Sequence, residues 1–337
     1  MKTVFVTGAT GFIGRHVVTK LLDRGCEVRC LVRSPARASH LQGSGARIIA
    51  GVLEDVSHWQ SHLAGCEAIF HIGGLVAACS RQELCATNGA AVGTLADACS
   101  ALALPPVLIH LSSLAASGPT LDAGHLRSEA DPPAPVSQYG QSKRAGELEL
   151  VRRAGRFPIT VIRPGIVFGP YDKNLVPIYQ MIHWIRLHLL MGFHNPRLSL
   201  LHVSDLVDLA LAAADRGERM AADDPHSARG IYNACDDREH PTYADLGRRV
   251  AASLRRSVLV VPLPLTLAIP TSYAVEQFWN LCGHASIVSP DKLREATATS
   301  WAASGARARQ QLGFAPRAVL NARLQETADW LREHKRL

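Results

Sequence analysis

Three glycines separate an apolar run from a helix-like stretch near the N-terminal end of the sequence. Residues 4–7 are strand-like, residues 14–22 have helical spacing, and Gly8, Gly11 and Gly14 punctuate the connection. Glycines at this spacing permit a tight turn and let the backbone approach a pyrophosphate, while the first N–H groups of the helix stay open to phosphate oxygens. The pattern therefore predicts a dinucleotide site on the first turn of a Rossmann fold.

Apolar runs and helix-like segments alternate through the first half of the chain. We expect strands at 4–7, 27–32, 47–50, 68–71, 107–112 and 159–163, and helices at 14–22, 90–102 and 139–154. Such alternation predicts an α/β fold, a doubly wound parallel sheet that binds ligands at the carboxyl ends of its strands. The periodicity becomes irregular after Pro170, which predicts a smaller, mostly helical C-terminal substrate lobe. The expected division is a Rossmann domain of residues 1–170 and 197–232 and a substrate-binding lobe of residues 171–196 and 233–337.

The end of the second expected strand bears on the choice of cofactor. NAD-specific Rossmann proteins carry an acidic residue here for the ribose hydroxyls, but this chain has Val32 followed by Arg33. A guanidinium pairs with the 2′-phosphate of NADP, which a carboxylate would repel. We therefore predict NADP(H) as the preferred cofactor, with Arg37 as a second contact and NAD(H) as the alternative. The other interpretation is that Arg33 is a solvated loop residue without a ligand.

Two further segments place reactive side chains after expected strands. Ser112 and Ser113 end the fifth strand, and Tyr139 and Lys143 open the following helix one turn apart. A phenol with a pKa of about 10 is a poor base at neutral pH, and a neighbouring ammonium lowers that pKa toward a useful value. A serine hydroxyl can hydrogen-bond a substrate oxygen. The glycine loop, the serines and the Tyr–Lys pair, in this order, predict a hydride-transfer site.

With these motifs the chain resembles the extended short-chain dehydrogenases/reductases, the NAD-dependent epimerase/dehydratase family. The resemblance covers nearly the whole chain, through residues 7–14, 51–53, 71–74, 111–118, 139–143, 163–170, 202–205, Trp301 and 312–316. It implies reversible carbonyl reduction with Tyr139 as the acid/base, Lys143 lowering its pKa and binding the ribose, and Ser113 orienting the substrate oxygen. Ser113 is preferred to Ser112 because the family's catalytic serine stands five residues before the glycine that matches Gly118.

The resemblance also implies the cofactor contacts and shows where this chain departs from the family pattern. The implied contacts are Gly8, Thr10, Gly11, Phe12, Ile13, Gly14, Arg33, Arg37, Leu53, Gly73, Tyr139, Lys143, Pro164 and Ile166. Val52 stands where the family often has Asp, and Gly73 stands where it has Ala. Asn88 lies close to a family asparagine but out of register with it, so we assign it no role.

Two positions distinguish the chain from members that modify nucleotide sugars. Ile166 stands where those members have Asn, and Leu198 stands where they have Arg, although Arg197 is adjacent. Apolar residues are abundant at 181–191 and 258–269, which indicates either the core of the lobe or an apolar substrate pocket. The chain is thus most similar to the dihydroflavonol-reductase and 3β-hydroxysteroid-dehydrogenase-like branch. A sugar epimerase or dehydratase and a non-catalytic NADP(H)-sensing protein are the alternatives.

Composition bears on partners and location. The net charge is +7, but the arginines are scattered, so we expect a small-molecule substrate and no nucleic acid. The eight cysteines form no C-x-x-C pair, which favours free thiols in the reducing cytoplasm and no metal site. Three prolines interrupt the uncharged stretch 257–273, so no integral membrane segment is expected. The resemblance and the alanine-rich stretch 90–103 predict a homodimer.

Overall fold

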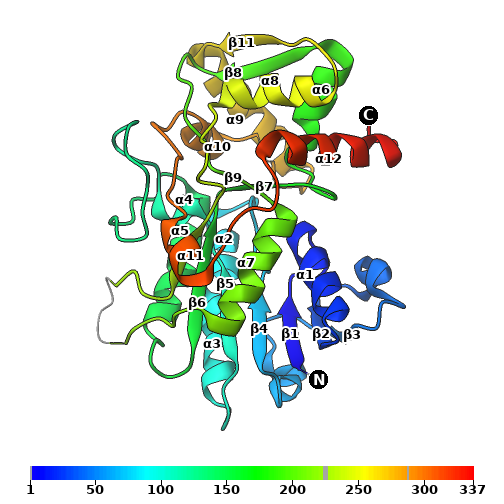
Figure 1. Ribbon diagram of the computed structural model, residues 1–337, viewed down its shortest axis with the longest axis vertical. Helices are drawn as coiled ribbons and strands as arrows, with labels where there is room; N and C mark the ends of the chain where they lie inside the picture. Colours follow the sequence, from blue (N-terminus) through cyan, green and yellow to red (C-terminus); the bar gives the residue numbers. More distant parts are fainter. Residues whose placement is uncertain (1, 223–226, 287) are drawn as a thin grey trace.

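The computed structural model describes residues 2–222, 227–286 and 288–337, and a seven-stranded parallel sheet organises the larger part of it (Figure 1). The strands are β1 (Thr3–Thr7), β2 (Glu27–Val32), β3 (Arg47–Ala50), β4 (Ala68–His71), β5 (Val107–Leu111), β6 (Ile159–Pro164) and β10 (Ile231–Ala234). Their order is β10-β6-β5-β4-β1-β2-β3, so the chain changes direction across the sheet between β1 and β4. This confirms the predicted doubly wound α/β fold and places a ligand crevice at the carboxyl ends of β1 and β4.

Both faces of the sheet are covered by helices. Val4 and Val6 pack with α1 (Phe12–Asp23), α7 (Val203–Arg216) and α11 (Ala306–Leu312) on one face. Phe5 points to the other face, into a core shared with α3 (Ala91–Ser100) and α5 (Gln138–Val151). Because side chains alternate along a strand, a strand buried on both faces must be apolar throughout. That requirement explains the uninterrupted apolar run in β1.

A second layer of structure lies beyond the carboxyl edge of the sheet, at the top of Figure 1. It contains α6 (Val176–Ile185), β8 (Leu187–Met191), α8 (Tyr243–Ser253), β11 (Leu259–Leu263), α9 (Leu265–Leu281), α10 (Pro290–Ala296) and α12 (Leu320–Glu333). Tyr179, Ile182, Leu246 and Leu324 belong to its own hydrophobic core. The short parallel pair β7 (Ile166–Phe168) and β9 (Leu200–His202) connects the two parts.

The remaining short elements are mostly connections around the sheet. They are η1 (Pro35–Leu41), η2 (Val56–His58), η3 (Gln60–Leu63), α2 (Arg81–Cys85), the π-helical turn η4 (Ala86–Ala90) and α4 (Leu114–Ser117). Strand β10 was not among the predicted strands, and it runs to Ala234, past the expected domain boundary after residue 232. Helix α11 also packs against α7 and β10 on the sheet. The domain division otherwise stays a prediction.

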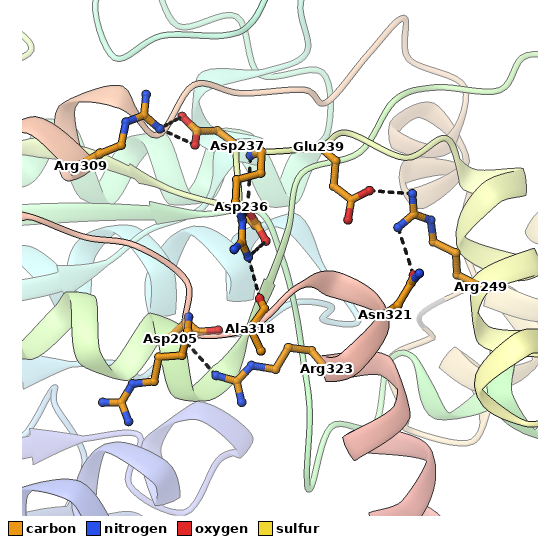
Figure 2. Close-up of polar contacts among 11 residues, drawn as sticks. Asp205, Asp236, Asp237, Glu239, Arg249, Arg309, Ala318, Asn321 and Arg323 are labelled. Atoms are coloured by element: carbon orange, nitrogen blue, oxygen red, sulfur yellow. Dashed lines mark hydrogen bonds and ion pairs between the residues drawn. The ribbon is translucent and has the colours of Figure 1, made fainter.

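Ion pairs connect the loop after β10 and the start of α7 to the C-terminal helices (Figure 2). The buried Asp205 of α7 accepts from Arg323 Nη2 of α12 at 2.9 Å. Glu239 accepts from Arg249 of α8 at 2.6 Å, and Asp237 pairs with Arg309 of α11 at 2.6 Å. The contacts of Arg249 and Arg323 hold α8 and α12 over the carboxyl edge of the sheet, where a ligand is expected.

Two further properties concern membranes and metals. In the part of the chain that the structure describes, no helix is both long and apolar enough to cross a bilayer. Within the same residues, no cluster of His, Cys, Asp and Glu side chains has a geometry suited to a metal ion. All eight cysteines are free thiols.

Candidate active site

The glycine loop has the geometry that a pyrophosphate requires. Gly8 has a φ of 75°, and a Cβ there would lie 2.5 Å from the Gly73 nitrogen. A Cβ on Gly14 would lie 2.0 Å from the Gly8 carbonyl oxygen, so both positions require glycine. Gly11 is the N-cap of α1, and the first turn of this helix has neither a side-chain cap nor an acidic residue. The exposed N–H groups at this helix end therefore fit a phosphate anion.

The other loop residues predicted to contact the cofactor lie around these glycines. Thr10 is half-buried in the loop, and Ile13 packs partly against the core beneath it. Phe12 makes an edge-to-face contact with His16, with the ring centroids 5.9 Å apart. Thr10 and Phe12 stay predicted cofactor contacts, as does Ile13, which packs beneath the turn.

The structure leaves the charges after β2 available to a ligand. Arg33 and Arg37 are exposed, and their side chains have no ion pair or hydrogen bond to any residue that the structure describes. Val32 is buried at the strand end, so no carboxylate approaches a ribose from this position. Leu53 packs partly against the core cluster that contains Trp59. It therefore offers the cofactor an apolar surface and no polar contact from its side chain.

The predicted contacts on the other strands lie at the same edge of the sheet. Gly73 follows β4, Pro164 ends β6 and is buried, and Ile166 begins β7 and is half-buried. A Cβ on Gly74 would lie 2.9 Å from Asn88 Oδ1 and 3.6 Å from Lys143 Nζ. The loop after β4 therefore runs directly past the lysine of the predicted catalytic set.

The structure brings Ser113, Tyr139 and Lys143 together at this edge. Ser113 caps α4 by accepting from the Ala115 N–H at 3.1 Å, and its hydroxyl is one of the groups that act on the pKa of Tyr139. The Lys143 ammonium is buried and donates to the Leu111 carbonyl at 2.7 Å. The Ser112 hydroxyl instead donates to Glu147 at 2.6 Å. Ser113 is thus the serine that faces Tyr139.

The protonation of Tyr139 differs from the sequence-based expectation. We expected Lys143 to lower the pKa of Tyr139, but burial raises that pKa to about 12, against an opposing hydrogen bond from Ser113. The Lys143 ammonium is directed at a backbone carbonyl, and burial lowers its own pKa to about 8. Tyr139 is therefore a protonated phenol at neutral pH, which suits the donation of a proton.

Asn88 is a residue of the site that sequence reasoning missed. It is 1% exposed, and its Nδ2 donates to the Leu75 carbonyl at 2.8 Å and to Ser142 Oγ at 2.9 Å. Its Oδ1 accepts from the Leu75 N–H at 2.8 Å, so it ties the loop after β4 to α5. Asn88 lies in the π-helical turn η4, which contains one more residue per turn than an α-helix.

A buried ion pair fixes α5 against the sheet. Glu147 accepts from Arg163 Nε at 2.8 Å and Nη2 at 2.7 Å, and Arg144 donates to it at 2.9 Å. Burial alone would raise the pKa of Glu147, but Arg163, Ser112 and Arg144 outweigh it and lower the pKa to about 2. Glu147 lies one turn beyond Lys143, so this pair sets the position of both reactive side chains on α5.

The Glu147 pair gives the protein a predictable response to acid. Because the pKa of this carboxyl is about 2 in the folded protein and ordinarily about 4.5, its stabilisation is complete above pH 4.5 and is lost as pH falls through 2. Glu147→Gln should lower the unfolding free energy at neutral pH by about 3–5 kcal/mol and flatten its fall at acid pH. Denaturant unfolding at several pH values measures both effects.

The matched control is Glu149→Gln, on the same helix. Glu149 pairs with Arg153 at 2.7 Å near the surface, so its loss should cost no more than about 1 kcal/mol and leave the acid response unchanged. An unchanged acid response in Glu147→Gln would contradict the assignment.

Comparison with known proteins agrees with this geometry. The profile of the NAD dependent epimerase/dehydratase family matches residues 4–235, which include the glycine loop and the Ser-Tyr-Lys set. The chain belongs to this family. This confirms the resemblance inferred from the motifs and makes a nicotinamide dinucleotide the expected cofactor of the loop after β1.

Individual members of the family show further similarity. The 4-hydroxy-2-methyl-3-oxo-4-farnesyl-3,4-dihydroquinoline-1-oxide ketoreductase of Stigmatella aurantiaca is 31% identical over 220 residues, 63% of this chain and 64% of that protein. A putative dihydroflavonol 4-reductase of Synechocystis sp. is 25% identical over 98% of this chain and 94% of its own length. The solved structure of MoeE5 in complex with UDP-glucose and NAD has a TM-score of 0.76 at 23% identity and covers 99% of each chain. This structural likeness shows the common fold.

Proposed function

We propose that this family member is an oxidoreductase that uses NADP(H) to interconvert a carbonyl and an alcohol on an apolar small molecule. The observation that carries the proposal is the convergence of Ser113, Tyr139 and Lys143 beside a loop that fits a pyrophosphate. The similarity to a ketoreductase and to a putative dihydroflavonol reductase supports this reaction class.

The proposed chemistry assigns a step to each side chain. When bound, the nicotinamide supplies the hydride for reduction and accepts it in oxidation. During reduction Ser113 donates a hydrogen bond to the carbonyl oxygen. The Tyr139 O–H bond breaks, its proton goes to that oxygen as the hydride bonds to carbon, and its electron pair stays on the phenolate. Lys143 is placed to bind the cofactor ribose.

The apolar character of the substrate is supported by two features. Leu198 is 4% exposed and Ile166 is half-buried, where sugar-modifying members have Arg and Asn. The lobe's apolar residues divide between its core and its surface: Ile182 is buried, whereas Leu267 and Phe278 of α9 are 57% and 61% exposed. Leu267 and Phe278 are thus available to an apolar ligand.

The cofactor, the assembly and the location are proposed on separate grounds. Arg33 and Arg37 are exposed and have no polar partner among the residues that the structure describes, which supports NADP(H) over NAD(H). All three alanines of α3, Ala91, Ala96 and Ala98, are buried within the chain, so the homodimer stays a prediction that rests on the family resemblance. The eight free cysteines support a cytoplasmic location, which also stays a prediction.

A substrate panel tests the proposed reaction. We expect NADPH-dependent reduction of farnesylated quinolone, dihydroflavonol or similar apolar ketones, and no conversion of UDP-glucose. The loss of NADPH absorbance measures the reduction. Tyr139→Phe is the control that shows which turnover belongs to this site. Conversion of UDP-glucose by the wild type, but not by Tyr139→Phe, would favour a sugar epimerase. Tight NADPH binding without turnover of any compound would favour a sensor.

A further inference from the structure

Helix α10 of the C-terminal lobe lies against the start of the helix that carries Tyr139. The Asp291 carboxylate accepts from the Gln138 N–H at 2.7 Å and from the Tyr139 N–H at 3.4 Å. The Ser137 hydroxyl, the N-cap of α5, donates to Glu295 at 2.5 Å. Carboxylates at the N-terminal end of a helix interact favourably with its unpaired N–H groups and its dipole. The lobe is thereby fixed to the first turn of α5.

The same helix places a cation on the Tyr139 ring. Lys292 Nζ lies 4.4 Å from the ring centroid and also donates to Glu295 Oε2 at 2.8 Å. The Lys292 and Glu295 side chains are only 24% and 19% exposed. Trp301 Nε1 donates to the Glu295 carbonyl at 2.8 Å and so holds the end of α10 in place. The contacts with Glu295 therefore keep the Lys292 ammonium at cation–π distance from the ring, where water screens its charge only in part.

The charges around Tyr139 come from two helices. On α5, Lys143 is one turn away and donates to the Leu111 carbonyl. On α10, Glu295 raises the pKa of Tyr139, Asp291 binds the backbone, and Lys292 is the cation against the ring. From α4 only the neutral Ser113 hydroxyl faces the phenol. Lys292 is thus placed to oppose the effect of Glu295.

We propose that Lys292 is a positioning residue for Tyr139. Glu295 holds the Lys292 ammonium against the phenol ring, where it stabilises the phenolate that is left when the Tyr139 proton departs. The inference rests on the proposed oxidoreductase function, because only proton transfer from Tyr139 creates that phenolate. A cation at this distance gains little from a neutral ring and much more from an ionised one. The stabilisation is thus largest where charge develops during the reaction.

The test compares substitutions of opposite sign on α10. Lys292→Met should move the Tyr139 ionisation to a pH about one unit higher, because Glu295 then faces the phenol unopposed. Glu295→Gln should move it to a lower pH, and Lys292→Arg should keep it near the wild-type value. The ionisation is read from the pH profile of kcat/KM for alcohol oxidation, which requires the phenolate as base.

Arg294→Met is the matched control, since it removes a cation from the same helix that pairs with Asp291 at 3.6 Å and is 59% exposed. It should leave the profile unchanged. Equal shifts in Lys292→Met and Arg294→Met, or a loss of rate in Lys292→Met without a shift, would overturn the proposal.

A second measurement separates this proposal from the proposed function. The tyrosinate absorbance of the NADP⁺ complex, taken as the difference between each protein and its Tyr139→Phe counterpart, reports the ionisation without any substrate. If no alcohol is oxidised but Lys292→Met and Glu295→Gln still shift this titration in opposite directions, the role of Lys292 stands and the reaction assignment fails. If the tyrosinate titrations of the wild type and both variants coincide, the role of Lys292 is overturned, whether or not the protein oxidises an alcohol.

Discussion

Replacing Tyr139 with Phe is expected to lower kcat by a factor of about 10² to 10⁴, while the dissociation constant of NADP(H) stays nearly unchanged. The substitution removes the proton that the substrate oxygen must receive and keeps the ring. The phosphates are expected to bind at the loop between Gly8 and Gly14, which does not depend on the phenol oxygen. Steady-state kinetics with a substrate from the panel and a fluorescence titration with NADPH measure the two quantities.

Lys143→Met is the informative comparison for this variant. Lys143 is buried, donates to the Leu111 carbonyl and is placed to bind the cofactor ribose, so turnover and cofactor affinity should fall together. Near-wild-type turnover in Tyr139→Phe would show that another group transfers the proton. If the Lys143→Met protein binds NADPH with wild-type affinity, the proposed contact between Lys143 and the cofactor ribose is wrong.

Replacing Arg33 with Asp is expected to reverse the cofactor preference from NADPH to NADH. The wild-type protein should bind NADPH more tightly, because the exposed Arg33 guanidinium, which contacts no polar group in the described part of the chain, can pair with the 2′-phosphate. A charge-assisted hydrogen bond of about 1.5–3 kcal/mol corresponds to roughly 10- to 100-fold in affinity. The introduced carboxylate repels the phosphate and accepts from the ribose hydroxyls of NADH. Parallel titrations of both proteins with both cofactors measure the change.

Arg24→Asp provides a control with the same change of net charge. Arg24 follows α1 at the end away from the glycine loop and pairs with Asp215 at the surface. Its substitution should leave the ratio of the two affinities unchanged. Equal affinities of the wild type for NADPH and NADH would refute the role of Arg33.

Much of this fold could be predicted from local pattern. The strands β1 to β6 and the helices α1, α3 and α5 lie within a few residues of their predicted positions, because the strands are short apolar runs and α1 has the apolar periodicity of a helix. The strand β10 is short and contains a buried asparagine, Asn233, so it lacks that pattern. Its place beside β6 depends on long-range pairing.

The sequence by itself determined the reaction class that we propose, because a strand, a glycine loop and a helix, followed by serines and a Tyr–Lys pair, are local arrangements of a few residues. Tertiary structure alone decided the electrostatics around Tyr139. Ser137 and Glu295 are 158 positions apart, yet they share a hydrogen bond. Lys292 reaches the Tyr139 ring through the same contact between α5 and α10. Burial and charge at a site are sums over everything packed around it, and most of those groups come from distant parts of the chain.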